Sequence, residues 1–542
     1  MKGKISLLSI ILVIMLLFSA CSKNDSNVNK QTDIVADNSN QETVKDDGKD
    51  KDTSEDGSKK EQVTITYLYP LSGDYLRAVD NLNDSLVIQK MEKITNVHME
   101  FIHPPAGQEA EQFNLMVASD DLPDMVTHGM GMPDSYPGGG DKAIKDGKYL
   151  ALNDLVESHA PNFKKIIDSD DELRKDILTD EGNIWGLPMI DKTAQTAFTG
   201  PIVRKDWMDE LALKEPKTID DWYQILKTFK DKKGVEVPFI IPSSGIPADD
   251  AFIGAYGISS SFYQIDNKIK FGPIEPEYKE YLTEMNKWYN EGLIDKDFPA
   301  WDNDKTVQYM TTGKAAAIAS GFWVFEPWET ASEDSNMKLM GVGYPALKEG
   351  EKPHLRQNNR RMRGYFTAIT TKCKHPERAM EWMDYFYSDD GFILANYGIE
   401  GKTFEKKDGE YQYTDLMLNN PEGVPPEIAF VKYAYSHGAF LRDWRREDTL
   451  FPKDALAACD VWDESADNDY MLPPIKLTAE EGEEFSQIMG DINTYIGEKR
   501  LDFIMGNESF DKFDEYVQQV KKMNIDKAIE LQQKALDRYN VR

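Results

Sequence analysis

Residues 63–127 read VTITYLYPLSGDYLRAVDNLNDSLVIQKMEKITNVHMEFIHPPAGQEAEQFNLMVASDDLPDMVT, and this stretch decides the fold class. Its first seven residues alternate as in a strand and stop at Pro70. Apolar spacing then predicts a helix at 83–95, a strand at 97–102, a helix at 109–119 and a strand at 124–127. Strands that alternate with helices usually pair in parallel through crossover connections. The stretch therefore predicts an α/β layer architecture.

The same alternation continues towards the C-terminus. Further strands are expected at 184–187, 198–204, 237–241, 313–319 and 363–370. Further helices are expected at 206–211, 218–230, 277–291, 376–387, 389–397, 479–505 and 510–539. A chain of 542 residues with this pattern is long enough for two or three structural units.

Composition excludes several classes of function. The chain has 63 Lys+Arg against 95 Asp+Glu, a formal net charge of −32. Such an excess of negative charge argues against binding nucleic acid or lying on anionic lipid through a basic face. Three cysteines exclude a disulfide framework and a multi-thiolate zinc site. With 40% hydrophobic residues, the chain can bury cores, and we expect a globular monomer.

The N-terminus predicts where the protein works. Lys2 and Lys4 precede an apolar run at 5–18 that is too short to span a membrane comfortably, and the run ends before Cys21. Residues 1–20 resemble a bacterial lipoprotein signal peptide, which implies that Cys21 is lipidated and anchors the protein at the extracellular face of the cell membrane. An uncleaved anchor, or a plain signal with a chance cysteine, is the alternative. Residues 21–62 hold the lipidated Cys and a polar, acidic linker without aromatic residues, which is expected to be disordered.

Four segments, together with the cysteine and its linker, carry a resemblance to a known family. They are LMVASDDLPDMV at 115–126, AAAIASGFWVFEPW at 315–328, FTAITTKCKHPERAMEWMDYFYSDDGFILANYGIEG at 366–401, and the closing helices at 503–539. They resemble the bacterial extracellular solute-binding proteins of family 1, the sugar-type lipoproteins that serve ABC importers. The resemblance covers nearly the whole chain from residue 63 onward.

The resemblance implies a periplasmic-binding-protein-like fold, with two α/β lobes joined by a hinge and the ligand cleft between them. It places the first part of the N-lobe at 63–128, the C-lobe at 129–359 and a returning N-lobe segment at 360–430. The helical segment at 431–542 is expected to pack across the lobes. The implied partners are a carbohydrate ligand and the permease subunits of an ABC transporter.

Motifs of catalysis are missing from the sequence. The seven His form no HExxH pair, and neither a phosphate-binding Gly-rich loop ending in Gly-Lys nor a Gly-x-Ser-x-Gly elbow occurs. We expect no catalytic residue and no cofactor. Pairs of carboxylates are abundant in so acidic a chain, so a secreted glycan-processing enzyme stays as a rival hypothesis.

Two smaller features of the sequence bear on whether the protein binds a metal or forms a disulfide. Asp463, Ser465, Asp467 and Asp469 alternate like the oxygens of a calcium-binding EF-hand loop, but Asn468 and Pro474 occupy two key positions. An acidic surface loop without a metal is therefore expected. Cys373 and Cys459 could pair in an oxidising compartment, and two separate thiols are preferred.

Aromatic residues are the main candidates for binding, because sugars present flat C–H faces and rims of hydroxyls. Trp323 ranks first, because it follows the small-residue strand at Gly321, where the backbone can turn, and because the Gly-x-Trp of the resembling family commonly faces the cleft. The other candidate ligand-binding residues are Phe322, Tyr67, Tyr69, Asp124, Trp185, Arg361, Arg363, Tyr397 and Trp444.

The arginines leave the class of ligand open. Arg360, Arg361 and Arg363 precede a strand, and three more arginines surround Trp444. They are expected to form salt bridges in an acidic protein, while an acidic, uronate-bearing sugar is the sharper alternative. A peptide or other solute bound by the same fold also remains open.

Overall fold

The computed structural model describes residues 61–71, 74–241, 251–357 and 360–542. All described residues belong to one compact unit of the chain. The expected signal peptide, Cys21 and nearly all of the expected linker lie outside the described residues. None of the helices between residues 61 and 542 that the structure describes has the length and apolarity needed to cross a membrane.

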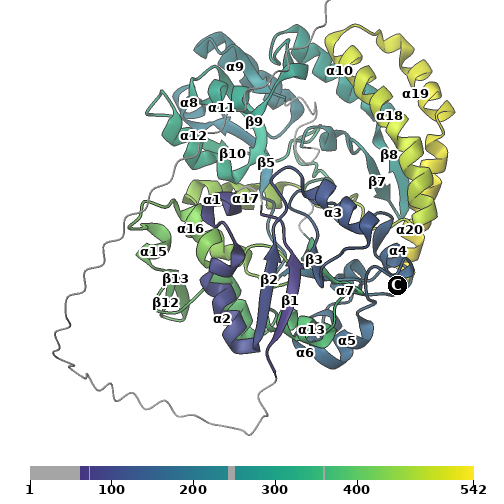
Figure 1. Cartoon of the computed structure of the whole chain (residues 1–542). Helices are drawn as coiled ribbons and strands as arrows, with labels where there is room; N and C mark the ends of the chain where they lie inside the picture. Colours follow the sequence, from purple (N-terminus) through teal and green to yellow (C-terminus); the bar gives the residue numbers. More distant parts are fainter. Residues whose placement is uncertain (1–60, 72–73, 242–250, 358–359) are drawn as a thin grey trace, which may run out of the picture. The chain divides into compact units, whose positions relative to one another are not determined.

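The first lobe is built on a six-stranded sheet with strand order β14-β4-β11-β3-β1-β2, of which Figure 1 labels β1, β2 and β3. The strands are β1 (Val63–Leu68), β2 (Val97–Ile102), β3 (Met125–Thr127), β4 (Leu187–Asp191), β11 (Met362–Ile369) and β14 (Leu441–Arg442). β1 pairs in parallel with both β2 and β3, through the crossover helices α2 (Leu86–Thr95) and α3 (Glu109–Ser119). The α/β architecture expected from residues 63–127 is confirmed.

Helices cover both faces of this sheet and fill two cores. They are α1 (Asp74–Ala78), α4 (Gly139–Lys145), α5 (Asn153–His159), α6 (Pro161–Asp168), α7 (Asp171–Ile177), α13 (Pro376–Tyr385) and α14 (Asp389–Tyr397). A small satellite core follows, with the hairpin β12 (Phe404–Lys407) and β13 (Glu410–Tyr413) and the helices α15 (Asp415–Leu418) and α16 (Pro426–Tyr433).

The second lobe is built on a four-stranded sheet with order β10-β5-β9-β6. Its strands are β5 (Thr199–Arg204), β6 (Val237–Ile240), β9 (Ala315–Gly321) and β10 (Leu339–Gly341). Ala315, Ala316 and Ala317 have no exposed surface, because their small side chains let neighbouring elements approach β9 closely. The remaining elements before β10 are α8 (Lys205–Glu210), α9 (Ile219–Lys233), the hairpin β7 (Phe262–Ile265) and β8 (Lys268–Phe271), α10 (Pro276–Asn290), α11 (Asn303–Thr311) and α12 (Phe325–Ala331).

The C-terminal helices complete this second lobe. They are α17 (Lys453–Ser465), α18 (Ala479–Met505), α19 (Phe513–Lys522) and α20 (Ile525–Val541), and Figure 1 shows α18 running beside α10 and α20. Trp462 of α17 is fully buried, and its indole N–H donates to the carbonyl of Pro201 in β5 at 3.1 Å. Residues 431–542, expected to pack across the lobes, thus share a core mainly with the second sheet.

The boundary expected at residue 129 differs from the one observed. β4 pairs with β11 in the first sheet, and α5, α6 and α7 pack into the same core as β1 and β2. Residues 129–191 therefore belong to the first lobe, and the change of lobe follows Asp191. Local periodicity predicts a strand here, but it carries no information about which sheet that strand joins.

Within the described residues, three segments cross between the lobes. They are residues 192–198 between β4 and β5, the connection from β10 to β11, and residues 443–452 between β14 and α17. We call these the three crossing segments. A returning strand, β11, which pairs antiparallel with β3 and β4, is what makes the second crossing necessary.

Candidate ligand-binding site

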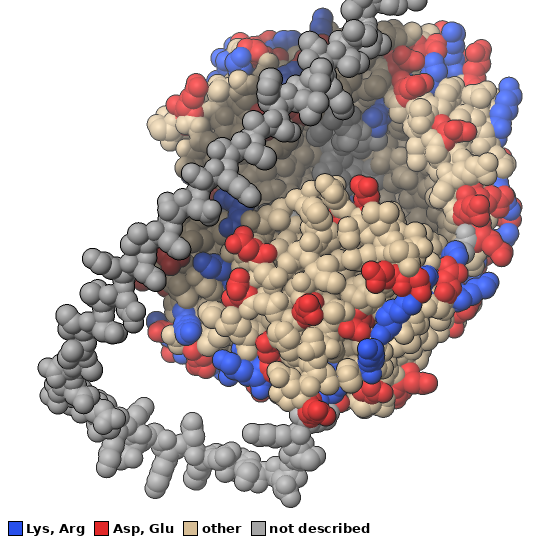
Figure 2. Space-filling model, in the orientation of Figure 1, with Lys and Arg blue, Asp and Glu red and all other residues tan. Residues whose placement is uncertain are grey.

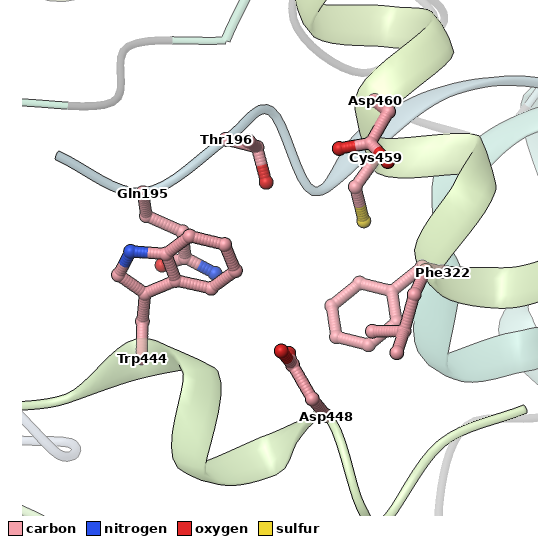
Figure 3. Close-up of a pocket in the computed structure, with 8 residues that line it drawn as sticks. Gln195, Thr196, Phe322, Trp444, Asp448, Cys459 and Asp460 are labelled. Carbon is pink, nitrogen blue, oxygen red and sulfur yellow. The ribbon is translucent and has the colours of Figure 1, made fainter. Parts of the chain in front are cut away.

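An open cavity of about 110 Å³ lies where two crossing segments meet the second lobe. Its lining residues are Gln195, Thr196, Phe322, Trp444, Asp448, Leu456, Cys459 and Asp460 (Figure 3). The first two belong to the crossing after β4, Trp444 and Asp448 to the crossing after β14, and the last three to α17. We call this space the crossing cavity. Figure 2 shows that the face drawn is hollowed and that both signs of charge are interspersed over it.

Two aromatic rings face the crossing cavity from opposite sides. Figure 3 shows Trp444 on one side and Phe322 on the other, with the side chains of Thr196 and Asp448 pointing into the space between them. The indole N–H of Trp444 donates to the Thr193 hydroxyl at 3.3 Å, which orients the ring. Phe322 is held edge-on against Phe451, with ring centroids 4.6 Å apart. The cavity therefore offers two fixed apolar surfaces.

Trp323 lies beside this cavity and is 47% exposed. Its ring contacts Phe198 and Phe322, with centroids 6.1 and 5.9 Å away. The ring folds back over Gly321, where an added Cβ would lie 2.2 Å from it. Only glycine at position 321 leaves room for this indole, so the Gly-x-Trp spacing is a steric requirement. Its role in binding stays a prediction.

A buried carboxylate holds the crossings to the first sheet. Asp191 ends β4 and has no exposed surface. Arg442 Nη1 lies 3.3 Å from Asp191 Oδ1, and Arg363 Nε lies 3.5 Å from Oδ2. Burial raises the pKa of Asp191, and the neighbouring arginines oppose that rise. Arg442 also donates to Gln195 Oε1 at 3.3 Å, which fixes one lining residue of the crossing cavity.

The side chain of Gln357 ties the second crossing to the first. Its Oε1 accepts hydrogen bonds from the backbone N–H groups of Phe198 and Thr199, at 2.6 and 3.0 Å. The first and second crossings are therefore hydrogen-bonded to one another at the start of β5.

Tyr67 and Tyr69, expected as aromatic platforms, lie in the core of the first lobe. Both are fully buried. The Tyr67 hydroxyl is hydrogen-bonded to Thr127 at 2.6 Å, and Tyr69 donates to the carbonyl of His437 at 3.1 Å. The placement as ligand contacts is not what the structure shows, because these residues lie on the same face of β1 as Ile65 and that face is covered by α13.

Trp185, Tyr397 and Asp124 also take structural positions. Trp185 stacks on Phe366 with centroids 4.6 Å apart, and Tyr397 donates to Asp443 at 2.9 Å from within the satellite core. Asp124 Oδ2 accepts from the backbone N–H and the hydroxyl of Thr66, both at 2.8 Å. Each side chain satisfies local packing or backbone groups and is placed away from the crossing cavity lining.

The two candidate arginines are held by carboxylates. Arg361 donates to Asp170 at 2.7 Å and to the Asp191 carbonyl at 2.9 Å. It lines a second cavity, of about 380 Å³, between α7 and residues 468–472. Arg363 lies over the Phe198 ring at 5.2 Å, next to Trp323. The structure supports the expectation that these arginines form salt bridges.

Six residues that line the crossing cavity were not predicted from the sequence. They are Gln195, Thr196, Asp448, Leu456, Cys459 and Asp460. What they share is their position, either directly after β4 or between the turn η7 (Trp444–Glu447) and α17 and within α17 itself. Such positions can be recognised only once it is known where the chain passes from one lobe to the other.

The acidic loop does not form a calcium-binding turn. Asp463 and Ser465 belong to the helix α17, and Asp463 pairs with Arg356 at 3.0 Å. Asp467 and Asp469 instead gather with His354, and their ligand-type atoms lie within 4.8 Å of one another. Cys373 and Cys459 are both free thiols, in line with the expectation that they do not pair.

Comparisons with known proteins agree with this geometry. The fructooligosaccharide ABC transporter substrate-binding protein FusA of Streptococcus pneumoniae is 27% identical over 489 residues, which cover 84% of this chain and 87% of FusA. The polygalacturonan/rhamnogalacturonan-binding protein YtcQ of Bacillus subtilis is 25% identical over 350 residues, 61% of this chain and 68% of YtcQ.

Solved structures share the fold. The alginate-binding protein AlgQ2 without calcium superposes with a TM-score of 0.65 at 25% identity, over 88% of this chain and 98% of AlgQ2. FusA of S. pneumoniae in complex with kestose superposes with a TM-score of 0.69 at 23% identity, over 88% of this chain and 99% of FusA. The family model described as bacterial extracellular solute-binding protein matches residues 83–391. The match, the two lobes and the three crossing segments together show that this chain belongs to the bacterial extracellular solute-binding proteins.

Proposed function

We propose that this protein captures an oligosaccharide at the crossing cavity and delivers it to the permease subunits of an ABC importer. The observation that carries the proposal is the pair of rings, Trp444 and Phe322, that face each other across a space with polar walls. Aromatic faces stack on the C–H faces of a sugar, while amide and hydroxyl groups such as those of Gln195 and Thr196 bond its rim.

The relatives support the same class of ligand. FusA is named for fructooligosaccharides and YtcQ for polygalacturonan and rhamnogalacturonan, and both are carbohydrate binders by those names. This chain offers an open cavity of about 110 Å³, and Trp323 adds a half-exposed ring at its edge. An oligosaccharide longer than the cavity can therefore extend along Trp323.

Delivery follows from the crossings. The cavity is lined by residues of the crossing segments and of the second lobe, so a ligand in it contacts the very segments that link the lobes. A ligand that bonds better to one lobe arrangement shifts the population towards it. A permease can then distinguish the loaded protein from the empty one by lobe geometry. We place the protein, as a monomer without catalytic activity, at the extracellular face of the cell membrane, anchored through Cys21.

A ligand screen tests the proposal. The purified chain from residue 22 is mixed with neutral oligosaccharides, uronate oligosaccharides, peptides and amino acids, and its thermal unfolding is measured. A true ligand at a hundredfold excess over its Kd adds about 2.7 kcal/mol to the free energy of unfolding. We expect stabilisation by oligosaccharides, confirmed by calorimetry.

Two results would contradict the proposal. Stabilisation by peptides or amino acids without stabilisation by any oligosaccharide would assign another solute. Release of shorter sugars from the mixture, followed by chromatography, would show a glycan-processing enzyme.

A further inference from the structure

We infer that the crossing cavity selects uncharged oligosaccharides and rejects those that carry uronate carboxylates. The inference rests on the proposed function and names the class of sugar that the site takes. It separates this chain from relatives named for polygalacturonan and alginate.

The charged groups of the cavity wall are carboxylates. Asp448, directly after the turn Trp444–Glu447, and Asp460 of α17 line the space from opposite elements, and both are exposed. Among the described lining residues there is no Lys and no Arg. A uronate entering between Trp444 and Phe322 would bring a third negative charge next to these two, in a site partly shielded from water.

The thiol of Cys459 shows that an anion is disfavoured at this wall of the cavity. Its thiol lines the same wall, one residue before Asp460. Burial, and then the negative charges of Asp460 and Asp448, raise the pKa of Cys459 to about 12. The same environment that disfavours the thiolate disfavours any other anion at this position.

The arginines near the cavity already face carboxylates or carbonyls, and the exposed Arg445, next to Trp444, lies 3.6 Å from Asp443. Arg442 and Arg363 pair with the fully buried Asp191, and Arg356 pairs with Asp463 at 3.0 Å. Arg446 donates to the carbonyl of Tyr435 at 2.8 Å. A guanidinium recognises a uronate by a two-pronged hydrogen bond, and turning one of these arginines towards a ligand would strip a buried carboxylate or carbonyl of its partner.

An uncharged sugar meets none of these costs. Its hydroxyls can donate to Asp448 and Asp460, and carboxylates are strong acceptors for such donors. The side chains of Gln195 and Thr196 supply further donors and acceptors on the same wall. The cavity is therefore matched to a ligand rich in hydroxyl donors and free of negative charge.

A matched pair of ligands tests the inference. A neutral oligosaccharide that stabilises the protein in the screen is oxidised at its primary hydroxyls to uronates, so that length and linkage stay the same. Calorimetry on the chain from residue 22 should show the neutral form binding at least tenfold more tightly. The difference should shrink as salt is raised, because salt screens the repulsion between exposed charges.

The double variant Asp448→Asn and Asp460→Asn should narrow the ratio of the two affinities at least threefold. Asp454→Asn is the control, because Asp454 is an exposed carboxylate on the same helix that does not line the cavity. Unliganded melting temperatures of both variants establish that they fold.

The outcomes distinguish failure of the inference from failure of the proposed function. Equal or tighter binding of the oxidised sugar, or a ratio that the double variant leaves unchanged, would overturn the inference while the proposed function stands. If neither neutral nor uronate oligosaccharides bind, the proposed function itself falls and the inference falls with it.

Discussion

Trp323 shows how a single glycine can make room for an exposed aromatic ring. The indole lies against the backbone of Gly321, in the space that a Cβ would occupy. Gly321 has φ −83°, so an alanine is allowed by its backbone and only the ring stands in its way. The half-exposed position of the Trp323 ring thus depends on the space above Gly321. A side chain added at position 321 would displace the ring without straining the main chain.

Replacement of the ring gives the first prediction. Trp323→Ala should weaken oligosaccharide binding at least tenfold, because an aromatic platform contributes on the scale of an interface hot spot, about 2 kcal/mol or more. The unliganded melting temperature should change little, since the ring is 47% exposed. Calorimetry and thermal unfolding measure the two effects.

Trp382→Ala is the control for that variant. Trp382 is fully buried in the first lobe and should lose about 3–5 kcal/mol of stability on truncation. Collapse of the fold in Trp323→Ala, with binding retained in whatever remains folded, would assign Trp323 to the core instead.

The glycine itself gives the second prediction. Gly321→Ala should displace the Trp323 ring and weaken binding several-fold, even though no atom that touches ligand is removed. Gly482→Ala is the matched control, because Gly482 lies in α18 with nothing within 4 Å of an added Cβ. That control should gain about 0.5–1 kcal/mol of stability from the better helix former and leave the affinity unchanged. Calorimetric affinities that are equal for wild type and Gly321→Ala would contradict this view.

Cys21 carries the third prediction, which concerns attachment. Cys21→Ser removes the thiol that lipid acylation requires, so the protein should move from the membrane fraction into the medium. Fractionation followed by immunoblotting measures this. Cys373→Ser serves as the control, because Cys373 is a free and half-buried thiol within the folded unit. Membrane retention of the Cys21→Ser protein would refute lipid anchoring.

Among the elements, the end of β4 depends most on electrostatic interactions. Asp191 is a buried carboxylate between Arg442 and Arg363, at the point where the chain leaves the first sheet. Asp191→Asn leaves these guanidinium groups without their negative partner. Loss of one member of a buried ion pair costs about 3–5 kcal/mol, and the free energy of unfolding in urea should fall by that amount.

Asp168→Asn provides the comparison for that fourth prediction. Asp168 also pairs with two cations, Lys164 and Arg174, but on the surface, where such pairs contribute about 0–1 kcal/mol. Equal losses in the two variants would show that the ion pairs of the crossings are no more important than surface pairs.

Elements differ in how far the sequence predicts them. The alternation in residues 63–127 fixed three strands and two helices, because each lies between Pro, Gly or Asp signals and has a clear period. Tyr67 and Tyr69 were misplaced for a physical reason: the period shows that both lie on one face of a strand, but not that α13 covers that face. Gln195 and Asp448 were not predicted because they lie in irregular segments, which have no apolar period to recognise.

At the scale of the whole molecule, the chain's last residues bind back onto the first lobe. Tyr539 donates to Asp176 at 2.6 Å, and Arg360 from the second crossing contacts the same carboxylate at 2.9 Å. Arg542 and Arg538 both pair with Asp180. The C-terminal helix therefore bridges the two lobes through a cluster of charges next to α7.

This bridge yields the fifth prediction. Removal of residues 538–542 should raise hydrogen exchange in residues 171–183 and lower the melting temperature by several degrees, because Asp176 and Asp180 lose their cationic or hydroxyl partners while α7 loses its cover. Mass spectrometry of exchange measures the first effect. Lys534→Ala is the control, since Lys534 lies on the same helix and pairs only with the exposed Glu530 in the contacts described. Unchanged exchange at residues 171–183 in the truncated protein would contradict the role of this bridge.

The distribution of tryptophan has an optical consequence. Of the ten tryptophans, eight are at most 8% exposed, whereas Trp323 is 47% exposed and Trp444 is half-buried at the cavity wall. The two indoles that water reaches are thus the two nearest the proposed ligand. Their emission should be red-shifted relative to that of the buried eight and open to quenching by acrylamide, and a sugar stacked on them would shield both. The protein carries its own fluorescent reporter of occupancy.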